Sequence, residues 1–600
     1  MLFNGEAIFG VVDFSCHAGT GKTKAEALVE RARDLGTRAQ YRVSGSTILG
    51  IALKPADGHQ WPVACENADV DALVMGEFYD RRQAGKLLRR DPERSRFLAD
   101  GYRSKGASFF QCLDGTFAAA VWDRSEERLV LLCDWRADAR LYFQLDGDLL
   151  VFSSWLQLLA GPLGVIDRRA VEEFLRFLYI APPRTIYDGI SCLEAGHYLT
   201  ASHGAIVSHA LPIVTLDANE NLPGENFDRT LDRFAELFQD AVRRRIGQRR
   251  VGMFLSSGVD SATLTAVCQS VNPGGVEAFT VGFADAALDE SNTAHAMAHH
   301  IGVPHTELKF DLSQYRWAFD LMVQGFDQPF ADPAGLPLIL ACESAKDRVD
   351  MISGGVGGDD LFGTPMPRHL WFSTAISAKF PPYLRNGIAA SLRQLPFAKI
   401  SNYAALFDFD DAEELFVTWS GWSKRELAEL MDETVNFSES GFYRAFRAHQ
   451  GEGMQELYNA LGFFPPDDCR FEAAALVNLP VEFPYHDAHL NSYVRNLPER
   501  YRYSDGHTKI LLRNLFNRYF PERLLSGKKH YFNIPLQALL AESNYAMVKH
   551  YLSADWINRV GLVDSSRATP WIERFVAGDE SLRFKVWAVL VLHAWLGSRS

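Results

Sequence analysis

Short apolar segments alternate with turn residues in the first third of the chain. β-Branched and aromatic residues fill these segments, and Asp or Gly residues separate them; the clearest are 7–13, 115–122, 128–133 and 149–152. Runs of this kind predict short strands. We therefore expect a layered, β-rich domain. A polar stretch at 216–224 marks the predicted boundary, which divides the chain into residues 1–215 and 216–600.

From residue 226 the pattern changes to longer helical spacings between apolar runs. Strands that alternate with helices predict a parallel sheet with helices on both faces. Beyond about residue 365 the pattern is mostly helical, and the fold class is therefore α/β. We expect strands at 251–255, 277–283 and 349–352, and helices at 227–246, from Ser261 and around 292–301.

Composition narrows the classes of function. The chain has 600 residues, more than one hydrophobic core usually serves, and its 47% apolar and 23% charged residues are ordinary for a soluble protein. A formal charge of −14 argues against a nucleic-acid partner bound through its phosphates.

Targeting and redox signals are also absent from the sequence. No apolar run reaches the roughly 18 residues of a membrane span, and the N-terminus lacks the features of a signal peptide. Eight scattered cysteines without a CxxC pair are typical of reduced thiols. We expect a cytoplasmic protein with no membrane partner.

A loop of small residues, Ser256-Ser-Gly-Val-Asp-Ser261, follows the first predicted strand of the second half and opens a helix. Ligands of parallel sheets bind beyond the carboxyl ends of the strands, and a helix N-terminus favours anions. Asp260 repels phosphate but suits Mg²⁺. A phosphate-binding loop is one interpretation of this loop, and an ordinary helix-capping loop is the other.

A second loop, Ser353-Gly-Gly-Val-Gly-Gly-Asp-Asp-Leu-Phe-Gly363, follows a later predicted strand. Its clustered glycines and two aspartates predict a facing anion site with a second metal ligand. A glycine-rich turn with solvated acids is the alternative. Two such loops on one sheet favour a shared phosphate site.

Six segments in chain order make the sequence resemble the asparagine synthetase superfamily over nearly its whole length. Besides the two loops, they are Thr280–Phe283 with Asp289–Ser291, Asp327–Pro333, Pro484–Asp487 and Gly506–Arg513. The resemblance implies an ATP-pyrophosphatase domain that adenylates a carboxylate.

The resemblance also implies roles for individual residues. Asp260 and Asp359 would hold Mg²⁺, and Lys509 would stabilise the charge that develops on the acyl group and pyrophosphate, as a mobile cation is suited to do. The residues implied to bind ATP are Leu255, Ser256, Ser257, Gly258, Asp260, Ser261, Val281, Gly354 and Gly355.

Three segments of the first third, Gly76–Tyr79, Gly115–Asp123 and Ser153–Leu156, resemble the family's glutamine amidotransferase domain, an αββα fold with an N-terminal nucleophile. An active domain begins with a cysteine whose own amine serves as the base. Here that position falls on Glu6, while residue 2 is Leu and Cys16 is internal; an expected acidic residue is Arg94. We therefore expect this domain to be inactive on glutamine.

Val356 narrows the choice of amine that would accept the activated acyl group. Asparagine synthetases carry an acidic residue there, and β-lactam synthetases a tyrosine. The branch that remains, with an inactive glutaminase domain, is the lasso peptide cyclase. It adenylates an Asp or Glu side chain of a leader-free core peptide, and the peptide's N-terminal amine closes a macrolactam. This resemblance implies a precursor peptide, a leader peptidase and a leader-recognition protein as partners.

The base for that amine is open, with Glu482, His486 and Asp487 as the nearest titratable candidates. Two alternatives to the cyclase also stay open. One is a ligase that uses ammonia or a small amine, of the asparagine or β-lactam synthetase type. The other is a non-catalytic binding scaffold, which would have no need of two metal ligands and a cation.

Overall fold

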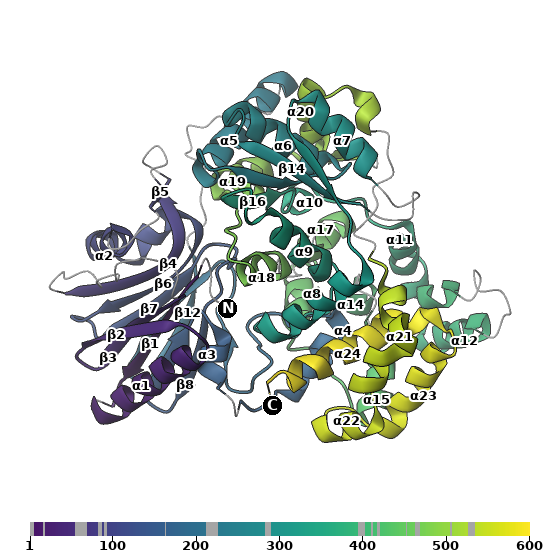
Figure 1. Ribbon diagram of the computed structural model, residues 1–600, viewed down its shortest axis with the longest axis horizontal. Helices are drawn as coiled ribbons and strands as arrows, with labels where there is room; N and C mark the ends of the chain where they lie inside the picture. Colours follow the sequence, from purple (N-terminus) through teal and green to yellow (C-terminus); the bar gives the residue numbers. More distant parts are fainter. Residues whose placement is uncertain are drawn as a thin grey trace.

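A computed structural model describes residues 5–599, apart from several internal segments. Those segments are 16–17, 55–68, 82–86, 89–92, 162–163, 212–225, 283–289, 394–401, 408, 410–411, 417–420, 452, 463–467, 505–506 and 526–533. Two stacked β-sheets lie on the left of Figure 1, and a helix-flanked sheet and a helical part form the rest. The predicted boundary at 216–224 lies outside the described residues and stays a prediction.

Two antiparallel six-stranded sheets form the first third. In spatial order, the first contains β10 (Ser191–Cys192), β8 (Tyr142–Asp146), β9 (Leu149–Ser153), β1 (Glu6–Asp13), β3 (Thr47–Leu53) and β2 (Arg38–Ser44). The second contains β12 (Ala205–Ala210), β11 (His197–Ser202), β7 (Arg128–Cys133), β6 (Leu113–Asp123), β4 (Val70–Asp80) and β5 (Leu87–Leu88).

Helices cover the outer faces of both sheets. Helix α1 (Ala18–Asp34) packs on β1, β2 and β3, and α2 (Glu93–Lys105) packs on β4. An apolar core that includes Ile8, Met75 and Leu131 lies between the sheets. Because both faces of β6 are covered, the strand is buried along almost its whole length, which explains its continuous apolar run. The predicted αββα arrangement is confirmed.

A four-stranded parallel sheet organises the second half, as predicted. Its order is β15 (His305–Leu308), β14 (Val276–Val281), β13 (Val251–Phe254) and β16 (Met351–Gly354). Strand β13 pairs in parallel with both β14 and β16, so the carboxyl ends of these three strands share one edge. The predicted strand at 349–352 lies two residues further along, and β15 was not predicted.

Helices flank both faces of this sheet. Packed together on one face are α5 (Phe227–Arg245), α6 (Val259–Val271), α7 (Ser291–His300), α19 (Ala488–Asn496) and α20 (Ile510–Tyr519). Residues of α9 (Gly335–Ala345) and α18 (Asp468–Leu476) pack on the other face, with α8 (Leu312–Gly325) against them. The apolar cluster on this second face is continuous with the core between the two N-terminal sheets, so the halves share buried surface.

The remaining described residues are mostly helical. These helices are α10 (Gly358–Phe362), α11 (Arg368–Ala375), α12 (Pro382–Arg393), α14 (Ala412–Leu415), α15 (Lys424–Met431), α16 (Gly441–Ala448), α17 (Met454–Gly462), α21 (Leu536–Tyr551), α22 (Ala554–Val560), α23 (Ser565–Val576) and α24 (Arg583–Gly597). From the first third, α3 (Leu156–Ala160) packs beside α1, whereas α4 (Arg168–Phe177) reaches across to pack on α15 and α24.

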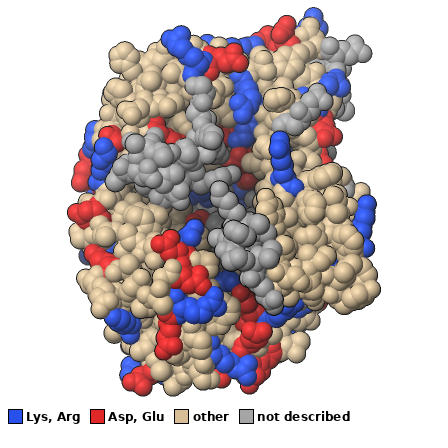
Figure 2. Space-filling model, turned by 90° about the vertical axis from the view of Figure 1, so that its right-hand side faces the viewer, with Lys and Arg blue, Asp and Glu red and all other residues tan. Residues whose placement is uncertain are grey.

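The distribution of surface charges and the state of the cysteines can be compared with the expectations from composition. Acidic and basic side chains are interspersed on the face that Figure 2 shows. Within the described ranges, no helix is long and apolar enough to cross a bilayer. Five of the eight cysteines are described as buried, free thiols: Cys112, Cys133, Cys192, Cys268 and Cys342.

Candidate functional site

The loop after β13 is held in shape by its own serines. Ser261 Oγ lies 2.9 Å from Ser256 Oγ and accepts from the backbone N of Ser256 at 3.1 Å. Ser256 Oγ in turn accepts from the backbone N of Gly258 at 3.2 Å. The predicted strand-to-helix loop is confirmed, with α6 beginning at Val259. Two of the serines that the resemblance implies bind ATP, Ser256 and Ser261, therefore also order the loop.

Neighbouring strands fix the ends of this loop. Leu255 is buried and donates its backbone N–H to Phe279 on β14 at 2.9 Å, and Thr280 Oγ1 donates to the Leu255 carbonyl at 2.7 Å. Val281, the last residue of β14, is half-buried beside them. The backbone N of Ser257 donates to Glu290 Oε2 at 3.0 Å. Glu290 lies in the matched segment Asp289–Ser291, but its contact with this loop was not predicted.

The second glycine loop packs directly onto the start of α6. Gly354 ends β16 opposite Phe254 of β13. A Cβ placed on Gly355 would lie 2.7 Å from the Ser261 backbone N, and one on Gly358 would lie 2.5 Å from Asp260 Oδ1. Only glycine permits such an approach. The two loops predicted to face one another are therefore in contact.

Three charged side chains meet where the loops join. Lys509 Nζ donates to Asp260 Oδ2 at 2.5 Å and also to Asp359 Oδ1. Lys509 and Asp260 are buried, whereas the Asp359 side chain is 43% exposed. The structure thus brings together three residues from α6, α10 and the start of α20, and solvent reaches them from the Asp359 side.

The backbone of Lys509 is held in an uncommon conformation. Its φ of 62° and ψ of 34° place a non-glycine residue in the left-handed region, immediately before α20. Such a conformation costs on the order of 1–3 kcal/mol and persists where surrounding contacts impose it. Here it points the ammonium group at both carboxylates, which makes this lysine a candidate functional residue.

Tyr485 supports the same cluster from behind. Its hydroxyl donates to the Asp260 carbonyl at 3.0 Å. Burial raises the pKa of Tyr485 well above its usual value, so the hydroxyl keeps its proton and remains a donor. This contact was not predicted, although the residue lies in one of the six matched segments.

The donor set suits Mg²⁺ bound together with a nucleotide. Two carboxylates, Asp260 and Asp359, converge on one ammonium group, and protein sites for Mg²⁺ commonly supply one or two carboxylates while phosphates and water complete the shell. Among the described residues, no group of three or more His, Cys, Asp or Glu side chains could hold a metal without such help. The site therefore fits a metal that arrives with phosphate.

Val356 itself offers no base, and two of the three candidate bases are buried in ion pairs. Val356 is half-buried against the apolar cluster that joins the two halves. Glu482 accepts from Arg245 at 2.9 Å, and Asp487 accepts from Arg244 at 2.8 Å. These two carboxylates are buried in ion pairs.

The third candidate base, His486, is buried as well. Its Nδ1 lies 2.7 Å from Asp138 Oδ2, an N-terminal carboxylate. Glu482 also accepts from Thr116 at 3.2 Å, and Asp487 lies 2.5 Å from the Tyr79 hydroxyl. All three candidates therefore bond to residues of the first third.

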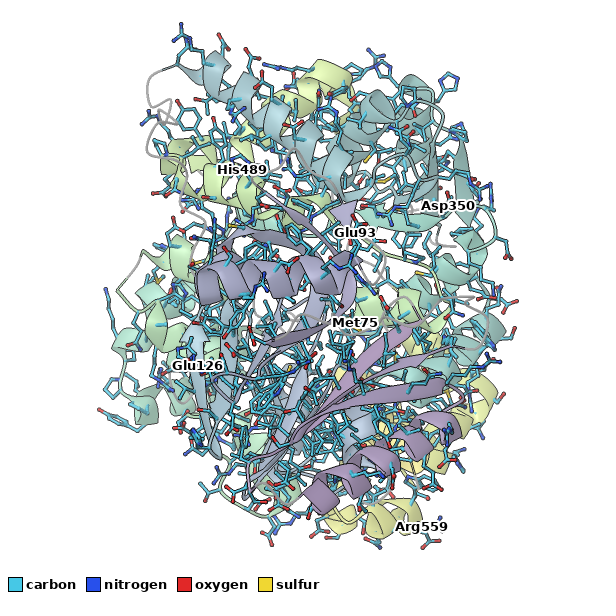
Figure 3. The ribbon with its side chains drawn as sticks, turned by 90° about the vertical axis from the view of Figure 1, so that its left-hand side faces the viewer. Met75, Glu93, Glu126, Asp350, His489 and Arg559 are labelled. Atoms are coloured by element: carbon cyan, nitrogen blue, oxygen red, sulfur yellow. The ribbon has the colours of Figure 1, made fainter. Side chains whose placement is uncertain are left out.

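An ion pair joins Glu6, at the position where a nucleophilic cysteine was expected, to Arg94. Arg94 donates to Glu6 Oε1 at 2.9 Å and to Oε2 at 3.1 Å. The backbone N of Gly76 donates to the same Glu6 carboxylate at 3.1 Å, and its carbonyl accepts from Arg94. Arg94 lies in the first turn of α2 rather than before that helix, next to Glu93, which Figure 3 labels with Met75 of β4. The two residues at which the sequence departs from the expected pattern thus bind each other.

Comparison with known proteins agrees with this geometry. The asparagine synthase family matches residues 233–597, and the glutamine amidotransferase domain matches residues 21–211. A Mycobacterium tuberculosis protein provisionally named a glutamine-hydrolysing asparagine synthetase is 27% identical over 319 residues, covering 50% of this chain and 48% of its own.

Two further relatives carry names of different enzyme classes, a synthetase and an amidase. Asparagine synthetase 1 of Bacillus subtilis, named as glutamine-hydrolysing, is 24% identical over 312 residues, which cover 50% of this chain and 49% of its own. An amidase of Penicillium rubens is 24% identical over 401 residues, which cover 59% and 58%. The matched region spans about half the length of these curated relatives.

Proposed function

Because this chain belongs to the asparagine synthase family, we propose that it is an ATP-dependent ligase that closes a lasso-type macrolactam in a peptide. The observation that carries the proposal is the meeting of Lys509 with Asp260 and Asp359 at the joined glycine loops. A cation beside two potential metal ligands suits the transfer of an adenylyl group from ATP to a carboxylate.

In the proposed first step, an Asp or Glu side-chain oxygen of a leader-free core peptide attacks the α-phosphorus of ATP. The bond to the bridging oxygen breaks, and pyrophosphate leaves with the electron pair. Mg²⁺, when bound, supplies positive charge for the phosphate oxygens. Lys509 adds a donor fixed in position before the reaction, where it stabilises charge on the pyrophosphate and the acyl group.

In the second step, the peptide's N-terminal amine attacks the acyl carbon. The carbon–oxygen bond to AMP breaks, an amide forms, and the nitrogen loses a proton. Holding both groups in one molecule near each other contributes roughly 7–11 kcal/mol in favourable intramolecular reactions. Since Val356 offers no proton acceptor and the candidate bases are buried in ion pairs, this proximity supports the use of a tethered amine.

The closed pair of Glu6 and Arg94 supports an acceptor other than ammonia from glutamine. An N-terminal nucleophile needs a thiol and a free amine, whereas the residue aligned with that position, Glu6, is a half-buried carboxylate bound by an arginine. We extend the proposal to a leader peptidase and a leader-recognition protein, which would supply the leader-free substrate.

One specific observation favours a second candidate. Relatives named as asparagine synthetases match half of this chain, so a ligase that uses aspartate and ammonia, or a small-molecule amine, is the competing proposal. It differs from the cyclase in the acceptor, whereas the activation of a carboxylate is common to both.

Blocking the N-terminal amine of the peptide distinguishes the cyclase from the ligase that uses ammonia or a small amine. We would incubate a leader-free core peptide with ATP, Mg²⁺ and hydroxylamine, using either a free or an acetylated N-terminus. The cyclase predicts AMP release with both peptides, cyclic product only with the free amine, and trapped hydroxamate with the acetylated one. AMP release that depends on free aspartate and ammonium, with no response to either peptide, would reject it.

A further inference from the structure

A turn between β7 and β8, residues 134–139, reaches from the first third into the second half. Trp135 Nε1 donates to the His486 carbonyl at 3.0 Å, and Arg136 Nη2 donates to Asp360 Oδ2 at 3.2 Å. Asp138 Oδ2 lies 2.7 Å from His486 Nδ1. Burial opposes charge on Asp138, but His486 and Arg136 outweigh that effect and lower its pKa to about 2. Three polar contacts therefore join the two halves at this turn.

The turn itself is rigid. Asp134 is buried, and its carboxylate accepts from the backbone N of Arg136 and of Asp138 at 3.1 Å each, and from that of Ala139 at 2.9 Å. Ala137 adopts a positive φ of 56°, which an alanine keeps only where its surroundings impose it. The turn therefore presents Trp135, Arg136 and Asp138 in a fixed arrangement.

The far ends of these contacts lie on both sides of the exposed carboxylate of the site. Gly357 immediately precedes α10 and has a φ of 88°, and a Cβ on it would lie 2.7 Å from the His486 ring. Asp360, held by Arg136, directly follows Asp359. The turn thus contacts the second glycine loop directly at Asp360 and indirectly, through His486, at Gly357.

A network of buried charges joins the two halves next to this turn. Arg245 is 2% exposed and donates to Asp114 at 3.0 Å and to Glu482 at 2.9 Å. Tyr79 donates to Asp114 at 2.8 Å and lies 2.5 Å from Asp487, which binds Arg244. Helix α19, which follows Asp487 and carries the His489 labelled in Figure 3, lies at the edge of the N-terminal sheets. Partners fixed by such a network hold the turn in one position.

We propose that the amidotransferase-like domain is retained as a positioning element, which uses Arg136, Trp135 and Asp138 to hold the second glycine loop so that Asp359 faces Asp260 and Lys509. None of the three is placed against the reacting groups, so they are positioning residues. The proposal rests on the proposed adenylation site. The amidotransferase-like domain would then have a function in the ligase reaction, although an ion pair stands where its nucleophile is expected.

The test compares Arg136→Ala, Arg136→Lys and Asp138→Asn with the wild-type full chain. Residues that support metal ligands from outside typically contribute about 10–100-fold to affinity or activity. For Arg136→Ala we expect about a tenfold loss in Mg·ATP affinity by calorimetry and in the kcat of AMP release, at the lower end of that range. Arg136→Lys should recover part of the loss. Thermal unfolding confirms that each variant folds.

Arg444→Ala is the matched control. It removes another ion pair between the halves, Arg444 to Glu194 at 2.7 Å, which lies on α16 and not at the glycine loop. Wild-type Mg·ATP affinity in this variant, with reduced affinity in Arg136→Ala, would support positioning. Wild-type affinity in Arg136→Ala and Asp138→Asn, or an equal loss in Arg444→Ala, would overturn it. Calorimetry with Mg·ATP alone needs no peptide, so it distinguishes this failure from a failure of the cyclase proposal.

Discussion

The two candidate centres of this chain contain similar charges in opposite arrangements. In the first third, Glu6 and Arg94 form a bidentate pair of equal and opposite charges that is almost closed to solvent. In the second half, one ammonium group faces two carboxylates, and one of these is exposed. The first arrangement is neutral and satisfied, whereas the second retains negative charge that suits a metal ion. The comparison supports our proposal that the second centre carries the ligase chemistry and that the first is inactive on glutamine.

The largest effect should come from the metal ligand. Asp260→Asn keeps the size of the side chain but removes the charge, so AMP formation should fall at least about 10²–10³-fold, as it does when a preorganised electrostatic contact is lost. The measurement is AMP release at saturating ATP. Asp350→Asn is a control at an exposed carboxylate paired with Arg250. Unaltered turnover in Asp260→Asn would remove the assignment of this residue as a metal ligand.

The closed pair should act on stability and not on catalysis. Glu6→Ala leaves Arg94 buried without its partner, which costs about 3 kcal/mol of unfolding free energy by comparison with other broken buried pairs. Glu6→Met with Arg94→Met should recover most of that loss. Chemical denaturation measures both variants.

A glutaminase assay tests directly whether the Glu6–Arg94 centre is inactive on glutamine. Glu6→Cys should not produce glutaminase activity, because the thiol would lack a free N-terminal amine and Arg94 would remain beside it. Release of ammonia from glutamine by the wild-type chain would contradict the view that this centre is closed.

Substitution of Lys509 should affect the rate of product formation much more than the affinity for ATP. Lys509→Ala is expected to lower the rate of product formation about 10²-fold, because a charge-stabilising donor is lost, while ATP affinity changes much less. Single-turnover kinetics and calorimetry measure the two quantities. Equal losses in both would assign Lys509 to nucleotide binding, and full activity would reject its role.

The smallest effect should come from Asp350→Asn. The exposed pair with Arg250 lies before β16, away from the carboxyl edge of the sheet, and surface ion pairs contribute little to stability. Turnover and melting temperature should both match the wild type. A clear loss of turnover would show that charges outside the Lys509 cluster also control the reaction.

Local patterns predicted much of the fold. The strand at 251–255 and the helix at 227–246 were visible because apolar periodicity and a following Ser/Gly loop are local signals. Strand β15 was missed because its four residues, His305–Leu308, contain only one large apolar side chain and pair along one edge of β14. Its hydrogen-bonded partner, and not its own composition, makes this segment a strand.

The site was predicted in its parts but not in its contacts. Motif resemblance indicated Asp260, Asp359 and Lys509, yet only the structure shows that one ammonium group bonds to both carboxylates. Contacts such as Arg136 with Asp360 join residues more than 200 positions apart, and no local pattern encodes them. The bond between Glu6 and Arg94 was likewise invisible, although both departures from the family pattern had been noted.

Mass spectrometry of a leader-free core peptide incubated with ATP and Mg²⁺ tests the central proposal most directly. The account predicts a product lighter than the peptide by one water, formed with one AMP and one pyrophosphate, and absent when Mg²⁺ is chelated. An unchanged linear peptide, together with robust formation of asparagine from aspartate and ammonium, would contradict it.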